Sequence, residues 1–178
     1  MTFSADAVAN YFLMLADREE RSLDPMKLQK LVYFAHGWHL ALTGRPLLSE
    51  PIQAWSYGPV IYSIYSEFKK YGDQPITSRA QEIRVENDGV ATYEPDIKME
   101  NQDLSWGKSV SKAIIERVWA LYKDYTGIQL SNLTHTEGTP WLTIKNTFPD
   151  GKIPRGINIP NELIKKFFKQ KMEQPSTA

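Results

Sequence analysis

The apolar positions near the start of the chain recur every three or four residues, which is typical of amphipathic helices. A first helix is predicted over residues 4–18, with the Ser4 side chain as its N-cap. A second helix is predicted to follow Asp24, because Pro25 suits the first helical position, and to end at Gly44. Its expected buried stripe consists of Leu28, Leu31, Val32, Ala35, Trp38 and Leu42.

Residues 52–72 are rich in aromatic side chains, with six rings within twenty-one positions. The tripeptide Tyr57-Gly58-Pro59 is a turn signal, and its proline is predicted to begin a third helix that ends at Gly72. The expected buried side of this helix consists of Ile61, Ile64, Tyr65 and Phe68. Core packing explains most of these rings, but Tyr62 lies about 100° from Ile61 around the helix, which favours a partner-binding role for Tyr62.

Residues 82–93 alternate with a period of two instead. Ile83 and Val85 precede the turn signal Asn87-Asp88-Gly89, and Val90 resumes the alternation after it. This pattern predicts an antiparallel β-hairpin. A polar linker with the sequence DIKMENQD follows it.

The last third of the chain returns to helical spacing. A long helix is predicted to end near Gly127, and its expected buried positions are Val110, Ala113, Ile114, Arg117, Val118, Leu121 and Tyr125. One short helix is expected around residues 130–133, another begins at Thr139-Pro140-Trp141, and a short strand is predicted around Ile157. Pro160 is predicted to begin a last amphipathic helix that buries Leu163, Ile164, Phe167 and Phe168.

Together these elements predict a mainly α (α+β) fold, a compact helical domain of about five to seven helices with one small antiparallel β-hairpin. The pattern contains no internal repeat and no boundary between two cores, so residues 1–173 are expected to form a single globular domain. The polar residues 174–178 are predicted to form a flexible tail.

The composition narrows the range of functions. Lys plus Arg and Asp plus Glu each number 21, so the net charge is zero, whereas a nucleic-acid-binding protein usually has a basic excess. The chain has no cysteine, which excludes disulfides, a thiol nucleophile and cysteine-ligated zinc. No basic leader precedes the first helix, and no apolar run approaches the roughly 20 residues that span a bilayer. A cytoplasmic location without a membrane partner is therefore expected.

Candidate catalytic chemistry is sparse. The sequence contains no glycine-rich phosphate loop of either common spacing and no Gly-x-Ser-x-Gly motif. His36 and His39 lie three residues apart on one predicted helix and could share a metal with His135. Their apolar surroundings favour packed, hydrogen-bonded histidines instead. We therefore expect a protein that is not an enzyme and needs no metal or other cofactor, with a small histidine-dependent hydrolase as the weakest alternative.

Two groups of lysines offer another alternative. Lys69 and Lys70 fall in the last turn of the third predicted helix, where cations complement the helix dipole without any ligand. The last predicted helix carries a denser group, Lys165, Lys166, Lys169 and Lys171. Such a stripe is usually a solvated face, but it keeps open a second hypothesis, a prophage nucleic-acid-binding regulator.

Residues 26–72 carry the most specific motif in the chain. It consists of Lys27-Leu28-Gln29-Lys30-Leu31-x-Tyr33, then Trp38, then Ala54-Trp55-x-Tyr57-Gly58-Pro59-Val60. A second block, LSNLTHTEGTPW, covers residues 130–141. In these motifs the chain resembles the Panacea domain of phage-associated GepA-like and SocA-like proteins. The likeness extends over nearly the whole chain and is weakest at residues 94–108.

The resemblance implies an antitoxin of a toxin–antitoxin pair, often carried by a prophage, which neutralises a cognate protein toxin by direct binding. Some members of the family act as proteolytic adaptors, so a protease or its unfoldase is an implied partner for those members. The chain shows no appended DNA-binding module, and nucleic acid is not an expected partner. The family-motif residues that the resemblance implies are Lys27, Gln29, Lys30, Tyr33, Trp38, Gly58, Pro59, His135 and Trp141.

The residues themselves indicate where a partner would bind. Tyr and Trp give a binding surface a large contact area at low entropy cost. The predicted partner-binding residues are therefore Trp55, Tyr57, Tyr62, Lys69 and Lys70. Trp38 and Phe68 fall within apolar stripes and are expected to belong to the core.

Overall fold

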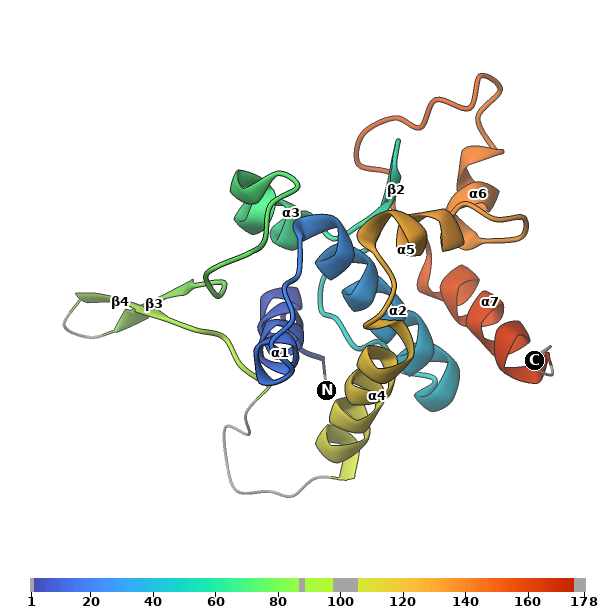
Figure 1. Cartoon of the computed structure of the whole chain (residues 1–178). Helices are drawn as coiled ribbons and strands as arrows, with labels where there is room; N and C mark the ends of the chain where they lie inside the picture. The colour runs from blue at the N-terminus through green and yellow to red at the C-terminus, as the bar shows by residue number, and fades with distance from the viewer. Residues whose placement is uncertain (1, 87–88, 98–105, 175–178) are drawn as a thin grey trace.

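The computed structural model describes residues 2–86, 89–97 and 106–174 (Figure 1). In these ranges it contains seven α-helices, one short 3-10 helix and two antiparallel strand pairs, so the predicted mainly α fold is confirmed. The helices are α1 (Ala5–Arg18), α2 (Pro25–Thr43), α3 (Tyr62–Phe68), η1 (Lys69–Tyr71), α4 (Trp106–Tyr122), α5 (Gly127–Leu133), α6 (Pro140–Lys145) and α7 (Asn161–Glu173). The strands are β1 (Gln53–Trp55), β2 (Gly58–Val60), β3 (Glu82–Glu86) and β4 (Gly89–Tyr93).

The ends of the first two helices lie where the sequence predicts them. The backbone N–H of Ala7 donates to the Ser4 hydroxyl oxygen over 3.2 Å, and the N–H of Lys27 donates to the Asp24 carboxylate over 2.9 Å. These bonds satisfy donors that have no partner within the helix. At the other end of α2, Gly44 adopts a left-handed conformation with φ 74°, which glycine adopts without a steric penalty.

Helix α2 is the centre of the molecule, and α1, α4, α5 and α7 all pack against it (Figure 1). Because neighbours surround it, α2 has no single buried stripe, and even Gln29, Lys30, His36 and His39 are buried. The expected stripe is therefore wrong in part. Leu42 is exposed near the end of the helix, and the family-motif residue Trp38 is only partly buried.

Pro59 does not begin a helix, contrary to the prediction, but lies in β2, opposite Ala54 of β1. The N–H of Ala54 points away from β2 and donates to the carbonyl of Ile157 over 2.8 Å, so this position of the strand pair needs no donor from proline. A bridge between Gln53 and Asn158 adds the predicted extended segment near Ile157 to the same side of β1.

Helix α3 begins three residues later than predicted, at Tyr62, and continues as η1 to Gly72. This helix is short, and it buries Ile64 and Phe68 against the core, with Ile61 buried just before it. Tyr65 was expected in the buried stripe, but 42% of it is exposed.

The buried face of α4 is rotated from the predicted one. Ile114 and Val118 are buried as expected, but the other buried residues of this helix include Ile115 and Trp119, while Leu121 is exposed. Three further residues that were predicted to be buried, Ala113, Arg117 and Tyr125, are also exposed. Ile115 and Trp119, one turn apart, therefore belong to the buried face of α4 in place of Ala113 and Arg117.

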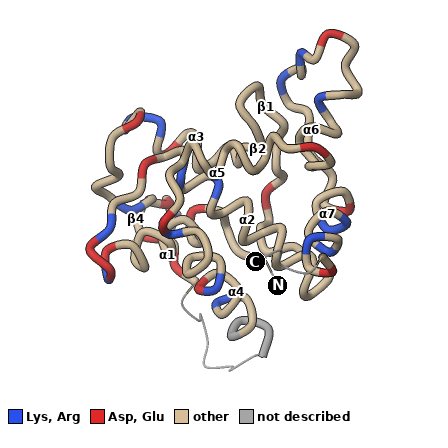
Figure 2. The backbone as a smooth tube through the Cα atoms, turned by 45° about the vertical axis from the view of Figure 1, so that its right-hand side comes forward, with Lys and Arg blue, Asp and Glu red and all other residues tan. Residues whose placement is uncertain are grey.

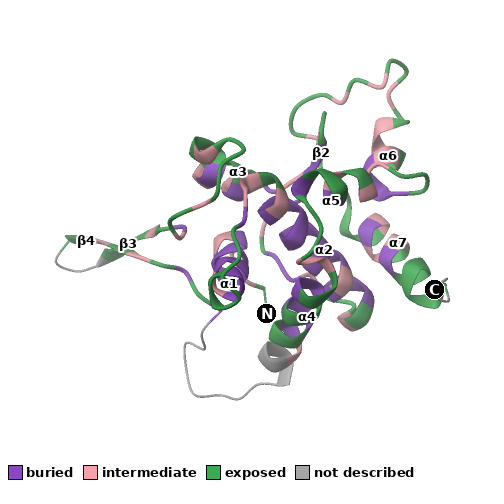
Figure 3. Cartoon of the chain, viewed as in Figure 1, coloured by how far each residue is buried: buried purple, intermediate pink, exposed green. Residues whose placement is uncertain are grey.

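Helix α7, which carries both buried and exposed positions (Figure 3), closes the core. Its Phe168 side chain lies among the rings of α2. The centroid of the Phe168 ring lies 6.0 Å from that of Tyr33, 6.1 Å from Phe34 and 5.2 Å from Trp38, each in an edge-on arrangement. Edge-on packing is favourable for aromatic rings. The predicted burial of Ile164 and Phe168 is confirmed, and Leu163 and Phe167 pack at the edge of the core.

Strands β3 and β4 form the predicted hairpin, which projects from the helical body (Figure 1). Val85 pairs with Val90, and Ile83 with Thr92, so the three apolar side chains share one face, and all are exposed. The Asn87-Asp88 part of the predicted turn lies outside the described residues, as do most of the polar linker and residues 175–178 of the tail. Nowhere in the described ranges is a helix both long and apolar enough to cross a membrane.

Candidate partner-binding site

Three aromatic side chains and one lysine lie close together where the β1–β2 hairpin meets α3, and a fourth aromatic residue occupies the turn of that hairpin. Tyr57 at the hairpin turn is 84% exposed, and Tyr62 at the start of α3 is 58% exposed. The ring of Trp55 lies between the hairpin and α3, 6.4 Å from the Tyr62 ring and 4.8 Å from the Tyr65 ring, centroid to centroid. The Lys69 ammonium lies 6.0 Å from the Tyr65 ring. We call Trp55, Tyr57, Tyr62, Tyr65 and Lys69 the aromatic patch.

Ring contacts bring together three of the five predicted partner-binding residues, Trp55, Tyr62 and Lys69, and add Tyr65. Tyr57 is exposed at the adjoining hairpin turn. Lys70 is exposed but turns elsewhere, to the Tyr71 ring at 5.4 Å and to the Glu67 carboxylate at 3.7 Å. Sequence reasoning assigned Tyr65 to the core because its spacing from Ile61 and Phe68 fits a buried stripe. The patch stays a predicted partner-binding site.

Buried side chains of the family motif donate hydrogen bonds to the backbone of the β1–β2 hairpin. The Lys30 ammonium donates to the carbonyl of Pro59 over 3.1 Å and to that of Tyr57 over 3.5 Å. The indole N–H of Trp141 donates to the carbonyl of Trp55 over 2.7 Å. Alternate carbonyls of the hairpin are therefore bound by side chains from two distant parts of the chain.

Gln29 extends this arrangement to the start of α3. Its amide nitrogen donates to the carbonyl of Ile61 over 2.9 Å, and its amide oxygen accepts from the N–H of Ile61 over 3.0 Å. Ile61 is the N-cap residue of α3 and offers no side-chain cap of its own. Gln29 therefore fixes the point at which the strand ends and the helix begins.

Gly58 allows the hairpin to lie directly on these side chains. A Cβ atom at this position would lie 2.6 Å from the Lys30 amine nitrogen, and 3.2 Å from both the His135 ring and the Thr134 hydroxyl. Its φ of 113° is also a conformation that other residues rarely adopt. Only glycine fits here, which accounts for its place in the motif beside Pro59.

The His135 ring lies next to Gly58, and the Trp141 ring packs against His135. Their ring centroids are 4.1 Å apart, and His135 Nδ1 donates to the carbonyl of Ser131 over 2.6 Å. The hydroxyl of Thr139 caps α6 and holds Trp141 in place through the N-terminus of that helix. The second family block therefore completes the support of the hairpin that the first block begins.

Lys30 is only 3% exposed, and burial lowers the pKa of its amine from 10.5 to about 7. Its hydrogen-bond acceptors are backbone carbonyls, and it forms no ion pair with any described carboxylate. A buried amine is costly for stability unless its hydrogen-bonding requirement is met. The sequence carries no local signal for this role, because α2 also contains Lys27, His36 and His39 and nothing in the spacing distinguishes Lys30 from them.

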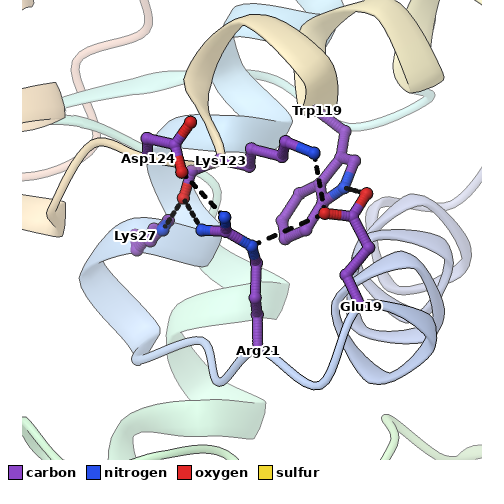
Figure 4. A network of polar contacts seen from close by, with 6 residues as sticks. All are labelled: Glu19, Arg21, Lys27, Trp119, Lys123 and Asp124. Carbon is purple, nitrogen blue, oxygen red and sulfur yellow. Dashed lines mark hydrogen bonds and ion pairs between the residues drawn. The ribbon is translucent and has the colours of Figure 1, made fainter.

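The other lysine of the motif, Lys27, belongs to a separate network near the end of α4 (Figure 4). Its ammonium donates to the carbonyl of Lys123 over 2.6 Å, and Arg21 donates to the same carbonyl over 3.3 Å. The Glu19 carboxylate accepts from the indole N–H of Trp119 over 2.9 Å and pairs with Lys123 over 2.7 Å. The network joins the turn between α1 and α2 to the last turn of α4.

The histidines are not assembled into one site. His36 Nε2 donates to the Asn161 amide oxygen over 2.9 Å, and the N–H of Leu48 donates to His36 Nδ1 over 3.3 Å. His39 Nδ1 donates to the carbonyl of Arg45 over 2.8 Å, whereas His135 lies under the hairpin. Burial lowers the pKa of both α2 histidines, that of His36 from 6.5 to about 4. The described residues contain no group of three His, Asp or Glu side chains placed to hold a metal ion.

Four lysine positions lie along α7, two of them adjacent (Figure 2). Lys166, Lys169 and Lys171 are exposed, and the ammonium of Lys171 lies 5.4 Å from the Phe167 ring. Lys165 is less exposed and pairs with Glu162 over 3.7 Å. This arrangement is that of a solvated helix face.

Comparison with known proteins identifies the family. Residues 28–142 match the family described as "Antitoxin SocA-like, Panacea domain". The chain belongs to this family. Among curated proteins it is 33% identical over 165 residues to Antitoxin SocA of Caulobacter vibrioides, an alignment that covers 93% of this chain and 82% of the relative. No solved structure matches significantly. The matched range contains the hairpin and every side chain that holds it.

Proposed function

We propose that this chain is the antitoxin of a toxin–antitoxin pair and neutralises its toxin by binding it directly through the aromatic patch. The observation that carries the proposal is that residues of the family motif have two separate roles, one in the core and one at the surface. Lys30 and Trp141 are buried and bind the backbone of the hairpin, and buried Gln29 binds Ile61 directly after it. The side chain of Tyr57 in the same motif is left exposed, as is that of Tyr62, two residues beyond the motif. A motif that only stabilised the core would have no physical reason to present exposed rings.

The chemistry of the patch suits protein recognition. Exposed Tyr and Trp rings offer large apolar contact areas with a polar tip, and residues of this kind dominate the energetics of protein interfaces. The indole N–H of Trp55 donates to the Gln53 amide over 2.8 Å, which fixes the ring before a partner arrives. A pre-ordered ring loses less entropy on binding.

Replacing Tyr57 or Tyr62 with alanine should weaken toxin binding by about 2 kcal/mol, the scale of an interface anchor. The same changes should alter the free energy of unfolding by less than about 1 kcal/mol, because both side chains are largely solvated. Calorimetric titration with the toxin and urea unfolding measure the two quantities. Tyr125→Ala is the matched control, since Tyr125 is a partly exposed tyrosine beyond the end of α4 and outside the patch. Unchanged affinity in both patch variants would place the recognition surface elsewhere.

The antitoxin role itself is tested by co-expression with the product of the adjacent gene in a host whose growth that product arrests. The expected result is that growth is restored and the two proteins purify together. The amount of toxin in the cells separates two modes of action. A stable complex indicates neutralisation by binding, whereas loss of the toxin that depends on a cellular protease indicates a proteolytic adaptor. Continued arrest, with both proteins present, would contradict the antitoxin role for that pair.

A further inference from the structure

The buried amine of Lys30 lies directly beneath the most exposed residue of the aromatic patch. Two of its hydrogen bonds go to the carbonyls of Tyr57 and Pro59, which flank Gly58. Gly58 in turn touches the amine so closely that a Cβ atom would lie 2.6 Å from it. Lys30 is therefore in a position to set the course of the backbone at the hairpin turn.

Burial of the Lys30 amine costs folding stability, so a role in packing alone does not explain this residue. Its amine is 3% exposed and forms no ion pair with a described carboxylate, and an apolar side chain of the same length would fill this space without burying a polar group. What an apolar side chain could not do is donate to two carbonyls at once. The distinctive contribution of Lys30 is therefore the conformation of the turn.

We propose that Lys30 is a positioning residue for partner recognition, which holds residues 55–59 so that Trp55 and Tyr57 are presented in one fixed arrangement. This inference rests on the proposed function of the patch. The contacts from Lys30, and that from Trp141 to the Trp55 carbonyl, reach only backbone atoms of the hairpin. The side chains at positions 55 and 57 can consequently be replaced without disturbing the support beneath them, and they are free to determine which partner is bound.

The first test needs no partner. Lys30→Met keeps the length of the side chain and removes the donor, so it should raise the hydrogen-exchange rates of the paired hairpin amides of Trp55, Gly58 and Val60 by roughly tenfold, the effect of losing one or two hydrogen bonds. Exchange in α1 and α4 should stay as in the wild-type protein. Lys27→Met is the matched control, because this lysine of the same motif donates instead to the carbonyl of Lys123, directly after α4. Hairpin exchange that does not change in Lys30→Met would overturn the proposal.

The second test uses the toxin that co-purifies in the co-expression experiment. Lys30→Met should weaken its binding by about tenfold, although Tyr57 and Tyr62 are intact, while Lys27→Met should bind like the wild-type protein. A loosened hairpin with unchanged affinity would also overturn the proposal. If Lys30→Met does not fold, Trp141→Phe replaces it, since this variant removes the donor to the Trp55 carbonyl, keeps an aromatic ring at this position and should give the same two effects. If the wild-type chain binds no toxin, the proposed function fails, and the exchange comparison still decides whether Lys30 holds the turn.

Discussion

Replacing Phe168 with alanine is expected to lower the free energy of unfolding by about 3–5 kcal/mol, the usual cost of removing a large ring from a core. Phe168 is fully buried and is the residue through which α7 reaches the rings of Tyr33, Phe34 and Trp38 on α2. The surrounding rings belong to a central helix held on several sides, so they cannot collapse into the space that alanine leaves. Urea unfolding followed by circular dichroism measures the loss.

Two controls separate the cavity from a general weakening of α7. Phe167→Ala changes the neighbouring ring, which is only partly buried, and should cost clearly less. Gly37→Ala places a Cβ atom 2.2 Å from the Phe168 ring, so it should destabilise the wild-type protein although alanine is the better helix former. In the Phe168→Ala background the ring is gone and the same substitution should be neutral or stabilising. Additive effects of the two substitutions would contradict direct packing of Gly37 against Phe168.

The parts of the fold that could be predicted from the sequence are those specified by local signals. Asp24, Pro25 and Gly44 define both ends of α2 because each acts through its own backbone or its nearest neighbours. The strands β1 and β2 have three residues each, too few for an alternating pattern, and Pro59 carries a helix-start signal that the pairing with Ala54 overrides. On α4 the competition between two apolar faces is decided by packing against α2, which no property of Leu121 or Trp119 alone reveals.

The candidate site, too, could be predicted from the sequence only in part. The density of rings in residues 52–72 led to the prediction of a partner-binding surface that includes Tyr57 and Tyr62; both side chains are exposed, and their role in binding stays a prediction. The role of Lys30 could not be predicted, because a lysine near the start of a helix usually points into solvent, and its burial depends on the hairpin that folds over it. The motif was recognisable from the sequence, but what each of its residues does became clear only from the tertiary contacts.

The second large effect concerns pH and arises from His36. Its Nδ1 accepts the N–H of Leu48 and its Nε2 donates to Asn161, so the neutral ring already satisfies both neighbours. A proton added to Nδ1 would face the N–H of Leu48 in a fully buried site, which agrees with a pKa lowered by burial from 6.5 to about 4. The unfolded chain takes up this proton below about pH 6.5 and the folded chain does not. Stability is therefore complete above pH 6.5 and should fall by about 3 kcal/mol as the pH drops to 4.

The measurement is the free energy of unfolding by urea from pH 4 to 7.5 for the wild-type protein and for His36→Gln, which cannot titrate. The comparison is needed because Asp6 has the opposite effect in the same window. Burial and the nearby Glu50 raise the pKa of Asp6 from 3.8 to about 6, so protonation of Asp6 favours the folded state as the pH falls. The contribution of Asp6 is common to both proteins and cancels in the difference. The difference between the two curves should thus be flat above pH 6.5 and change by about 3 kcal/mol between pH 6.5 and 4. Parallel curves over the whole range would show that His36 takes up its proton as readily in the folded protein as in the unfolded one.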